Sequence, residues 1–431
     1  MVKAYLELLR LPGASAAAVP AALARLAGTM VPLALLLTLV QSGRSLAVGG
    51  GAGAAYAVGS AVGGPFIGRL MDRRGPGPVL RLTAPAAALI LLGLALWAKD
   101  SATVVLLAGA CAAGLVTAPV GASMRALWPG LTEDPALRRR AYSFEATLSE
   151  TLFILGPTAV TVLATLTGSR GALLVTAVLL GVGGLGFGQA PAVRGRRGPA
   201  PDGATGGKRP GAGGHRRTAA TAVLVAIALT AALSSGLVVA VTASLRDQGS
   251  SPELAGTLVA LQSVGSVVGG LLYGARAFGG TTYHRYLRLL VVLTLALATL
   301  PTVRLALHAG LPPSWALALL AALLVLSGLP IAPAGAEEFQ LIGEMAARDK
   351  ATQAFAGVGS VISIGGAAGS AVTGLVADRL GSTAALCMPA LFTLAALLLS
   401  LAARRPVVRA VSAPEAGLST PPAPNQGELQ P

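Results

Sequence analysis

Long runs of apolar residues, separated by short clusters of charged residues, extend from about residue 16 to residue 402. An α-helix that crosses the roughly 30 Å hydrocarbon core of a bilayer needs about 20 such residues. Membrane-spanning strands are about half that length and alternate between apolar and polar residues, and the runs show no such alternation. The pattern therefore predicts twelve transmembrane helices, at residues 16–39, 48–68, 80–98, 102–126, 141–166, 171–189, 219–244, 252–275, 287–307, 313–337, 354–376 and 383–402.

The composition agrees with a chain that is solvated mainly by lipid. Hydrophobic residues make up 54% of the chain and charged residues only 11%, and the mean hydropathy is +0.73. The formal charge of +15 does not indicate a nucleic-acid partner, because the basic residues lie in short clusters between apolar runs. Cys111 and Cys387 both lie inside apolar runs, so we expect no disulfide, metal site or cofactor.

The basic residues also predict the orientation of the chain. Lys and Arg beside membrane spans are retained on the cytoplasmic side. With a cytoplasmic N-terminus, 25 of the 32 Lys and Arg residues fall in cytoplasmic segments and six in outer segments, and Arg25 lies within the first span. We therefore expect a multi-pass protein of the cytoplasmic membrane with both termini in the cytoplasm.

A segment rich in Gly, Pro and basic residues divides the chain in two. It follows the sixth span and has almost no apolar content, which is typical of a linker. The Pro-rich end of the chain predicts a disordered tail. The expected organisation is a six-helix bundle at residues 1–190, a cytoplasmic linker at 191–218, a second six-helix bundle at 219–403 and a disordered cytoplasmic tail at 404–431.

Short sequences in the first half recur in the same order in the second half. GSAVGG from Gly59 recurs as GSVVGG from Gly265, and APVGA from Ala118 recurs as APAGA from Ala332. In the third match, Gly156 corresponds to Gly369, and Gly168-Ser169 corresponds to Gly381-Ser382. Three matches in one order indicate a parallel duplication of six spans. Parallel halves of this kind are typical of secondary transporters, which bind their substrate between the halves near the middle of the membrane. An inert scaffold built from two such bundles is the alternative.

The loop between the second and third predicted spans carries a family motif. It reads GRLMDRRGPGPVL and resembles the signature of the major facilitator superfamily, G-x-L-x-D-R-x-G, at Gly68, Leu70, Asp72, Arg73 and Gly75. The basic pair that usually follows is replaced by Pro-Gly-Pro. The resemblance implies two six-helix bundles that rock about a central cavity. It also implies that Asp72 caps the N-terminal end of the eleventh span when the cytoplasmic gate is closed, since a helix N-terminus stabilises a carboxylate.

A second sequence also fits the motif but lies in a different place. GLVADRLG begins at Gly374 and falls on the outer side in the predicted topology. The counterpart in the second half is YGARAFGG near Gly274, which has no Asp. The resemblance therefore implies an asymmetric gate whose stronger latch belongs to the first half.

Few charged residues lie within the predicted spans, and each costs a few kcal/mol there. Arg25 and Glu150 lie equally far into the first and fifth spans, so the two can form an ion pair if these helices are neighbours, as the family resemblance implies. Glu145 lies nearer the cytoplasm and about 140° around the helix from Glu150. These three residues are candidates for proton coupling or for the substrate cavity; a permanent ion pair that fixes helix packing is the alternative for Arg25 and Glu150.

A second set of charges closes the fourth and tenth spans. Arg125, Glu337 and Glu338 lie near the cytoplasmic ends of these spans, so we expect them to make gating contacts. Together with the motif loop, the candidate gate residues are Gly68, Leu70, Asp72, Arg73, Gly75, Arg125, Glu337 and Glu338.

The sequence thus predicts an all-α integral membrane protein, with a central cavity between two pseudo-symmetric bundles, that transports a small molecule by alternating access. Gly156-Pro157 resembles part of the superfamily's antiporter signature, which favours proton-coupled efflux of a drug or metabolite over proton-coupled uptake. A transporter-like receptor or assembly protein is a third hypothesis. No catalytic motif is present, so we expect no enzyme activity. The expected partners are the substrate, protons and the lipid bilayer, with the protein a monomer.

Overall fold

The computed structural model describes residues 7–195, 212–249, 254–276 and 278–412, and these residues form helices and connecting turns without any strand. The helices of the first half are α2 (Ala14–Gln41), α3 (Leu46–Arg74), α4 (Pro76–Trp97), α5 (Thr103–Val116), α6 (Val120–Leu131), α7 (Pro135–Gln189) and α8 (Pro191–Arg194). Those of the second half are α9 (Ala212–Asp247), α10 (Leu254–Ala275), α11 (Thr282–Ala298), α12 (Thr302–His308), α13 (Pro313–Gly328), α14 (Ile331–Met345), α15 (Ala351–Ala402) and α16 (Arg404–Ser412), with a 3-10 turn at Arg348–Lys350.

Within the described residues, ten helical segments are long and apolar enough to cross a membrane. Two of them, α7 and α15, have 55 and 52 residues, and a straight helix of that length would measure about 80 Å, more than twice the bilayer core. Both turn back at a glycine with positive φ, Gly168 at 75° and Gly381 at 83°. Ten segments with two divided in this way are consistent with the twelve predicted spans, and the two turns lie in the predicted gaps at residues 167–170 and 377–382.

The same close helix contact occurs in both halves. A Cβ atom on Gly63 would lie 2.1 Å from the backbone oxygen of Leu115, and one on Gly269 would lie 1.8 Å from that of Leu329. The glycines differ by 206 positions and the leucines by 214, which are the offsets of the two repeated sequences on these helices. The glycines that carry the sequence repeat are therefore the sites where α3 meets α5 and where α10 meets α13.

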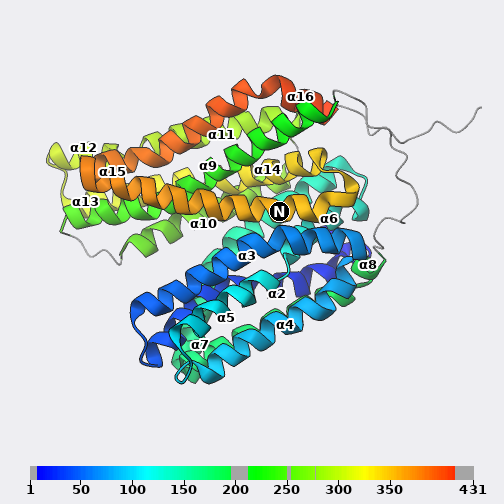
Figure 1. Cartoon of the computed structure of the whole chain (residues 1–431). Helices are drawn as coiled ribbons and strands as arrows, with labels where there is room; N and C mark the ends of the chain where they lie inside the picture. Colours follow the sequence, from blue (N-terminus) through cyan, green and yellow to red (C-terminus); the bar gives the residue numbers. More distant parts are fainter. Residues whose placement is uncertain (1–6, 196–211, 250–253, 277, 413–431) are drawn as a thin grey trace, which may run out of the picture.

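The two halves form two bundles that lie beside each other (Figure 1), the first from blue to green and the second from green to red. They contact each other through α3 and α6 against α15, and through α7 against α10 and α14. A hydrophobic cluster shared by both halves includes Tyr142 and Phe355, whose ring centroids are 6.1 Å apart. We call the contacts between the two halves around this cluster the closing contacts. They lie toward the end of α3 that carries Arg73 and Arg74.

Two predicted segment boundaries differ from the structure. Helix α9 already begins at Ala212, inside the range expected to be linker, and α8 occupies residues 191–194 at its other end. The tail was expected to be disordered from residue 404, but residues 404–412 form α16, where Val407 and Ala410 are buried against the second half. Its apolar residues are spaced for one helical face, which explains the packing. Residues 196–211 and 413–431 lie outside the described residues.

Candidate functional site

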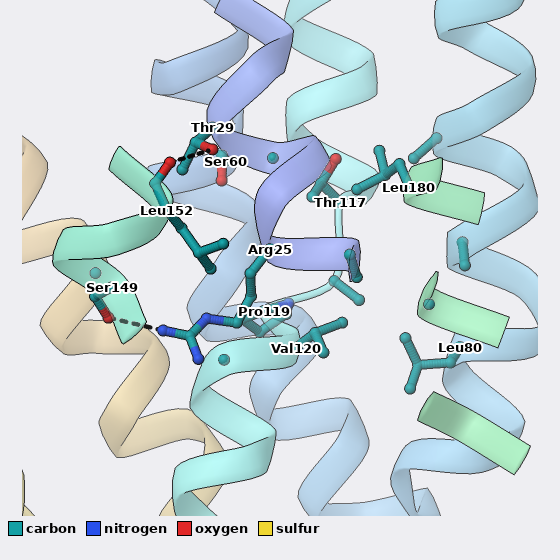
Figure 2. A pocket seen from close by; sticks show the side chains of 18 of the residues that line it. Arg25, Thr29, Ser60, Leu80, Thr117, Pro119, Val120, Ser149, Leu152 and Leu180 are labelled. Carbon is teal, nitrogen blue, oxygen red and sulfur yellow. Dashed lines mark hydrogen bonds between the residues drawn. The ribbon is translucent and has the colours of Figure 1, made fainter. Parts of the chain in front are cut away.

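A cavity of about 350 Å³ lies in the first half (Figure 2), bordered by α2, α3, α4, α7 and the break between α5 and α6. One lining residue, Gly359, comes from α15 of the second half. The break occurs at Thr117–Pro119, where Pro119 has no amide hydrogen to continue the helix. Most of the wall is apolar, and its polar side chains are Arg25, Thr29, Tyr56, Ser60, Thr117, Arg125 and Ser149.

Arg25 reaches across the cavity wall from α2 to α7. Its Nη1 donates to Oε2 of Glu145 at 2.8 Å, and its Nη2 donates to Oγ of Ser149 at 2.7 Å. Gly121 makes room for the side chain, because a Cβ there would lie 3.2 Å from Nε of Arg25. The partner of Arg25 is thus Glu145, and the predicted pairing with Glu150 is wrong.

Glu145 is contacted by polar groups from two other helices, α2 and α6. Besides Arg25 of α2, it faces Nε of Arg125 at 3.9 Å and accepts a hydrogen bond from Nε1 of Trp128 at 3.2 Å, both from α6. Its side chain is 1% exposed, whereas those of Arg25 and Arg125 are 11% and 14% exposed. Two guanidinium groups and one carboxylate leave one positive charge in excess at the Arg25–Glu145–Arg125 cluster.

Arg125 also joins the two halves. Its guanidinium carbon lies 4.0 Å from the centre of the Phe339 ring on α14, an arrangement that attracts the cation to the face of the ring. Its Nη2 donates to Oγ of Ser149 at 3.4 Å, and its Nε has no hydrogen-bond partner among the described residues. The residue therefore belongs both to the cavity wall and to the closing contacts.

Glu150 takes no part in this cluster. It lies on α7, half-buried, and does not line the cavity. Within the described chain no hydrogen bond or ion pair of Glu150 is found.

Glu337 and Glu338 are held inside the second half. Glu337 forms a bidentate ion pair with Arg285 of α11, at 2.9 and 3.0 Å, and accepts a hydrogen bond from Tyr273 of α10. Glu338 accepts hydrogen bonds from Thr230 at 3.0 Å and Tyr286 at 3.2 Å. In this conformation both carboxylates bond to their own half, and Phe339 is the neighbour that crosses to Arg125.

Asp72 joins α3 of the first half to α15 of the second. Its Oδ1 accepts from the amide of Thr352 at 3.0 Å and its Oδ2 accepts from the amide of Gln353 at 2.8 Å. Helix α15 begins at Ala351, so these amides belong to its first turn and have no partner within the helix. The structure contains the cap that the family resemblance implied.

The other residues of the motif shape this junction. A Cβ on Gly68 would lie 3.1 Å from that of Ala356, so a glycine lets α3 approach α15. Leu70 packs against the core of the first half and Arg73 is exposed at the end of α3. Gly75 separates α3 from α4 with a φ of 82°, which favours glycine.

Sequence reasoning missed three residues of the site: Ser149, Trp128 and Phe339. Ser149 lies four residues after Glu145 and Trp128 three after Arg125, so helical spacing places each pair on one face and could have linked them. Phe339 gave no such signal, because its role depends on how the halves dock. No group of three or more His, Cys, Asp or Glu side chains in the described ranges is placed to hold a metal ion.

Comparisons with known proteins agree with this fold. The sequence model described as Major Facilitator Superfamily matches residues 18–227. No curated protein matches the chain.

Solved structures of transporters share the architecture over most of the chain. The human organic anion transporter MFSD10 (TETRAN) has a TM-score of 0.67 at 18% identity and covers 90% of this chain and 98% of its own. A bacterial homologue of the iron transporter ferroportin, in an outward-facing state, has a TM-score of 0.65 at 14% identity, with coverages of 93% and 99%. The E. coli fucose:proton symporter FucP has a TM-score of 0.65 at 16% identity, with coverages of 92% and 99%.

Proposed function

This chain is a multi-pass membrane protein that belongs to the major facilitator superfamily, and from this premise we propose that it transports a small anionic molecule by alternating access. The closing contacts form its cytoplasmic gate, and the cavity beside the Arg25–Glu145–Arg125 cluster holds the substrate. The conformation described above then has its cytoplasmic gate closed.

The observation that carries the proposal is the excess positive charge at the cavity. Arg25 and Arg125 are permanently charged and share the single carboxylate of Glu145. Both line the cavity, where the surrounding lipid and apolar wall weaken screening. An uncompensated cation in such a place is costly, and an anionic group that enters the cavity would remove that cost.

A purely structural role for the cluster is the competing explanation. A structural ion pair would need one cation for one carboxylate, whereas here Arg125 is a second cation, whose Nε lies 3.9 Å from the same carboxylate and makes no hydrogen bond among the described residues. The charge of the cavity carries the proposal, rather than the likeness to an organic anion transporter, because at 18% identity that likeness extends to the fold alone.

The gate follows from the same geometry. Opening the cytoplasmic side must separate Asp72 from the amides of Thr352 and Gln353, and Arg125 from Phe339. In other states of the cycle, we propose that Glu337 or Glu338 forms an ion pair with Arg125. We propose protons as the driving ion, with Arg25 and Glu145 as the residues that couple them.

Two directions of transport fit the fold. Export in exchange for protons requires proton and substrate to compete for the carrier, whereas uptake together with protons requires them to bind at the same time. The Gly156-Pro157 pair favoured export, but Gly156 has a packing role here: a Cβ on it would lie 2.2 Å from Oγ1 of Thr29. The pair therefore no longer distinguishes the two directions.

Exchange in proteoliposomes tests the proposal. Liposomes loaded with one compound and supplied with its labelled form should exchange members of a panel of carboxylates, organophosphates and aryl sulfonates, but not neutral or cationic amphiphiles of similar size. Arg25→Gln and Arg125→Gln should each weaken apparent affinity about tenfold to a hundredfold, since each removes a charged hydrogen-bond donor worth about 1.5–3 kcal/mol.

Arg44→Gln is the matched control for these variants. Arg44 lies outside the cavity and donates only to the backbone oxygens of Lys99 and Ser101, so this variant should exchange anions as the parent protein does. Exchange of cations or neutral compounds with no exchange of anions would overturn the proposal.

A further inference from the structure

We propose that the second half binds the headgroup of an anionic phospholipid where α16 meets the start of α11, with Arg404, His284 and Arg288 around the lipid phosphate. In the predicted topology this end of the bundle lies at the cytoplasmic leaflet. The site is separate from the cavity, which lies in the first half. The inference therefore does not depend on the compound that is transported.

Two basic side chains meet at this site without a carboxylate between them. Nη2 of Arg404 lies 3.3 Å from Nε2 of His284, and Nδ1 of His284 lies 2.8 Å from Oγ1 of Thr281. A neutral imidazole with its proton on Nδ1 donates to Thr281 and accepts from Arg404. The neutral ring takes up one donor of Arg404 but does not compensate the charge of the guanidinium.

Further arginines surround this pair. Arg288 lies one helical turn after His284 on α11, Arg217 lies near the start of α9, and both are exposed. Arg405 and Arg409 on α16 are exposed as well. Within the described part of the chain, none of these arginines forms an ion pair. We call Arg217, Arg288, Arg404, Arg405 and Arg409 the basic surface.

The carboxylates near the basic surface are bound elsewhere. Glu337 is paired with Arg285. Glu344 of α14 accepts hydrogen bonds from Thr282 at 2.7 Å and from Gln340 at 2.9 Å, and it has no cation among its described partners. Five arginines therefore face one nearby carboxylate that is not already paired, and the surface keeps a large excess of positive charge.

Helix α16 has the form of a helix that lies in the headgroup region. It begins at Arg404, directly after α15 ends at Ala402, and it packs beside the start of α9 (Figure 1). Its residues Val407 and Ala410 are buried against the bundle, whereas Arg405 and Arg409 lie about half a turn away on the opposite face. Exposed basic residues on an amphipathic helix next to a membrane span attract anionic lipids.

The position of Arg288 favours a lipid over a soluble partner. It lies six residues after the start of α11 at Thr282, about 9 Å along the helix axis, in a segment that is long and apolar enough to cross the membrane. An exposed arginine at this depth extends its apolar stem so that its guanidinium reaches the headgroups. A phospholipid phosphate at that level can be contacted by Arg288 from α11 and by Arg404 from α16. Guanidinium groups bind phosphate oxygens through charged hydrogen bonds.

Native mass spectrometry of the delipidated full-length protein tests the inference. The protein is titrated with phosphatidylglycerol and, separately, with phosphatidylcholine of the same acyl chains. The first phosphatidylglycerol should bind about tenfold or more tightly than the first phosphatidylcholine, and increasing salt should reduce the difference. Arg404→Gln and Arg288→Gln should each weaken the binding of phosphatidylglycerol about fivefold, which is typical for one basic residue at an anionic headgroup.

Arg379→Gln is the matched control. Arg379 is an exposed arginine of the same half, but it stands beside the turn at Gly381, at the other end of the first crossing of α15. This variant should bind phosphatidylglycerol as the parent protein does. Arg404→Lys, which keeps the charge, should bind it more nearly as the parent does than Arg404→Gln. Equal affinity of the parent for the two lipids, or an equal loss in Arg379→Gln and Arg404→Gln, would overturn the inference.

A soluble anion is distinguished by competition. Glycerol phosphate at millimolar concentration carries the same phosphate without acyl chains, and it should leave the bound phosphatidylglycerol in place. Displacement of the lipid would assign the site to a soluble phosphate compound and overturn the lipid site.

Hydrogen exchange of α16 gives a second readout in a bilayer. In nanodiscs, the amides of residues 404–410 should exchange more slowly when phosphatidylglycerol is present than in phosphatidylcholine alone, because a bound headgroup holds the helix in place. The double variant Arg405→Gln/Arg409→Gln should lose most of this difference. Its two changes are on exposed side chains, so we expect it to fold. Exchange in the parent protein that is the same in both lipids would contradict the proposed contact.

Discussion

The guanidinium of Arg125 lies 4.0 Å over the ring of Phe339, and the two residues occupy equivalent positions in the two halves of the chain. They are 214 positions apart, which is the offset between the repeated sequences APVGA and APAGA. Residues related by the pseudo-twofold repeat meet where its axis passes between the bundles. A contact at this point is broken when the halves separate, so it stabilises only the conformation closed at this end.

Phe339→Leu should therefore shift the protein toward the state that is open at the closing contacts. The lost cation–π interaction is worth about 0.5–2 kcal/mol, which changes the ratio of the two states from about twofold to about thirtyfold. A cysteine introduced at Ser143 reports the change, because Ser143 is fully buried and donates to the backbone oxygen of Gly270 across the closing contacts. Its labelling rate, measured with Cys111 and Cys387 replaced, should increase.

The control for this variant is Phe66→Leu. Phe66 is 72% exposed on α3 and makes no part of the closing contacts, so labelling at the introduced cysteine should stay unchanged. Equal labelling rates in Phe339→Leu and the parent would show that the aromatic contact does not bias the gate.

Asp72→Asn should also raise the population that is open at this end. The carboxylate binds two amides of the first turn of α15, where its charge is stabilised by the helix dipole. Asn keeps one oxygen acceptor and loses the charge, so we expect a cost of about 1 kcal/mol to the closed state and a roughly fivefold shift in the ratio.

Asp378→Asn is the matched control, because Asp378 stands in the other D-R-x-G sequence. It should leave the labelling rate of the cysteine at position 143 unchanged. An equal effect of the two variants would reject Asp72 as a specific latch.

The sequence predicted the twelve crossings because two signals agreed. Apolar length marks each span, and the paired glycines at 168 and 381 lie where a turn with positive φ is required. Asp72 was placed correctly because its motif carries a fixed location in the fold. Phe339 was out of reach, since packing between halves depends on docking geometry that no local pattern encodes.

The mistaken pairing of Arg25 with Glu150 has a simple physical origin. The apolar run that predicts the fifth span begins at residue 141, but α7 begins at Pro135, so Glu150 lies further along its helix than Arg25 does along α2. Arg25 lies 11 residues after the start of α2 at Ala14, and Glu145 lies 10 residues after the start of α7. The polar first turns of α7 hid the true start of the helix from a search for apolar runs.

Gly63→Ala and Gly64→Ala should differ sharply in stability although the glycines are neighbours on α3. A Cβ on Gly63 would lie 2.1 Å from the backbone oxygen of Leu115, whereas a Cβ on Gly64 meets no atom within 4 Å. Overpacking of this kind costs about 1–3 kcal/mol, so Gly63→Ala should lower the thermal melting temperature in detergent. Gly64→Ala should keep or slightly raise it, and identical melting curves would contradict the close contact of α3 with α5.

Glu150→Gln separates the two carboxylates of α7 that could carry the proton. If Glu150 were the carrier, the variant would lose gradient-driven transport and keep exchange, because Gln cannot bind and release a proton. We expect Glu150→Gln to keep gradient-driven transport, because Arg25 forms its ion pair with Glu145 and not with Glu150. Glu150 is half-buried and has no bonded partner among the described residues, so Gln, which carries no charge into the membrane, should not lower the free energy of unfolding. Removal of Glu145 would instead leave two arginines without their carboxylate, at a cost of about 3–5 kcal/mol.

Thermal stability and transport driven by an imposed pH gradient, measured on Glu145→Ala and Glu150→Gln, distinguish the two assignments. A stable Glu150→Gln protein that exchanges substrate but no longer accumulates it would show that Glu150, and not Glu145, carries the proton.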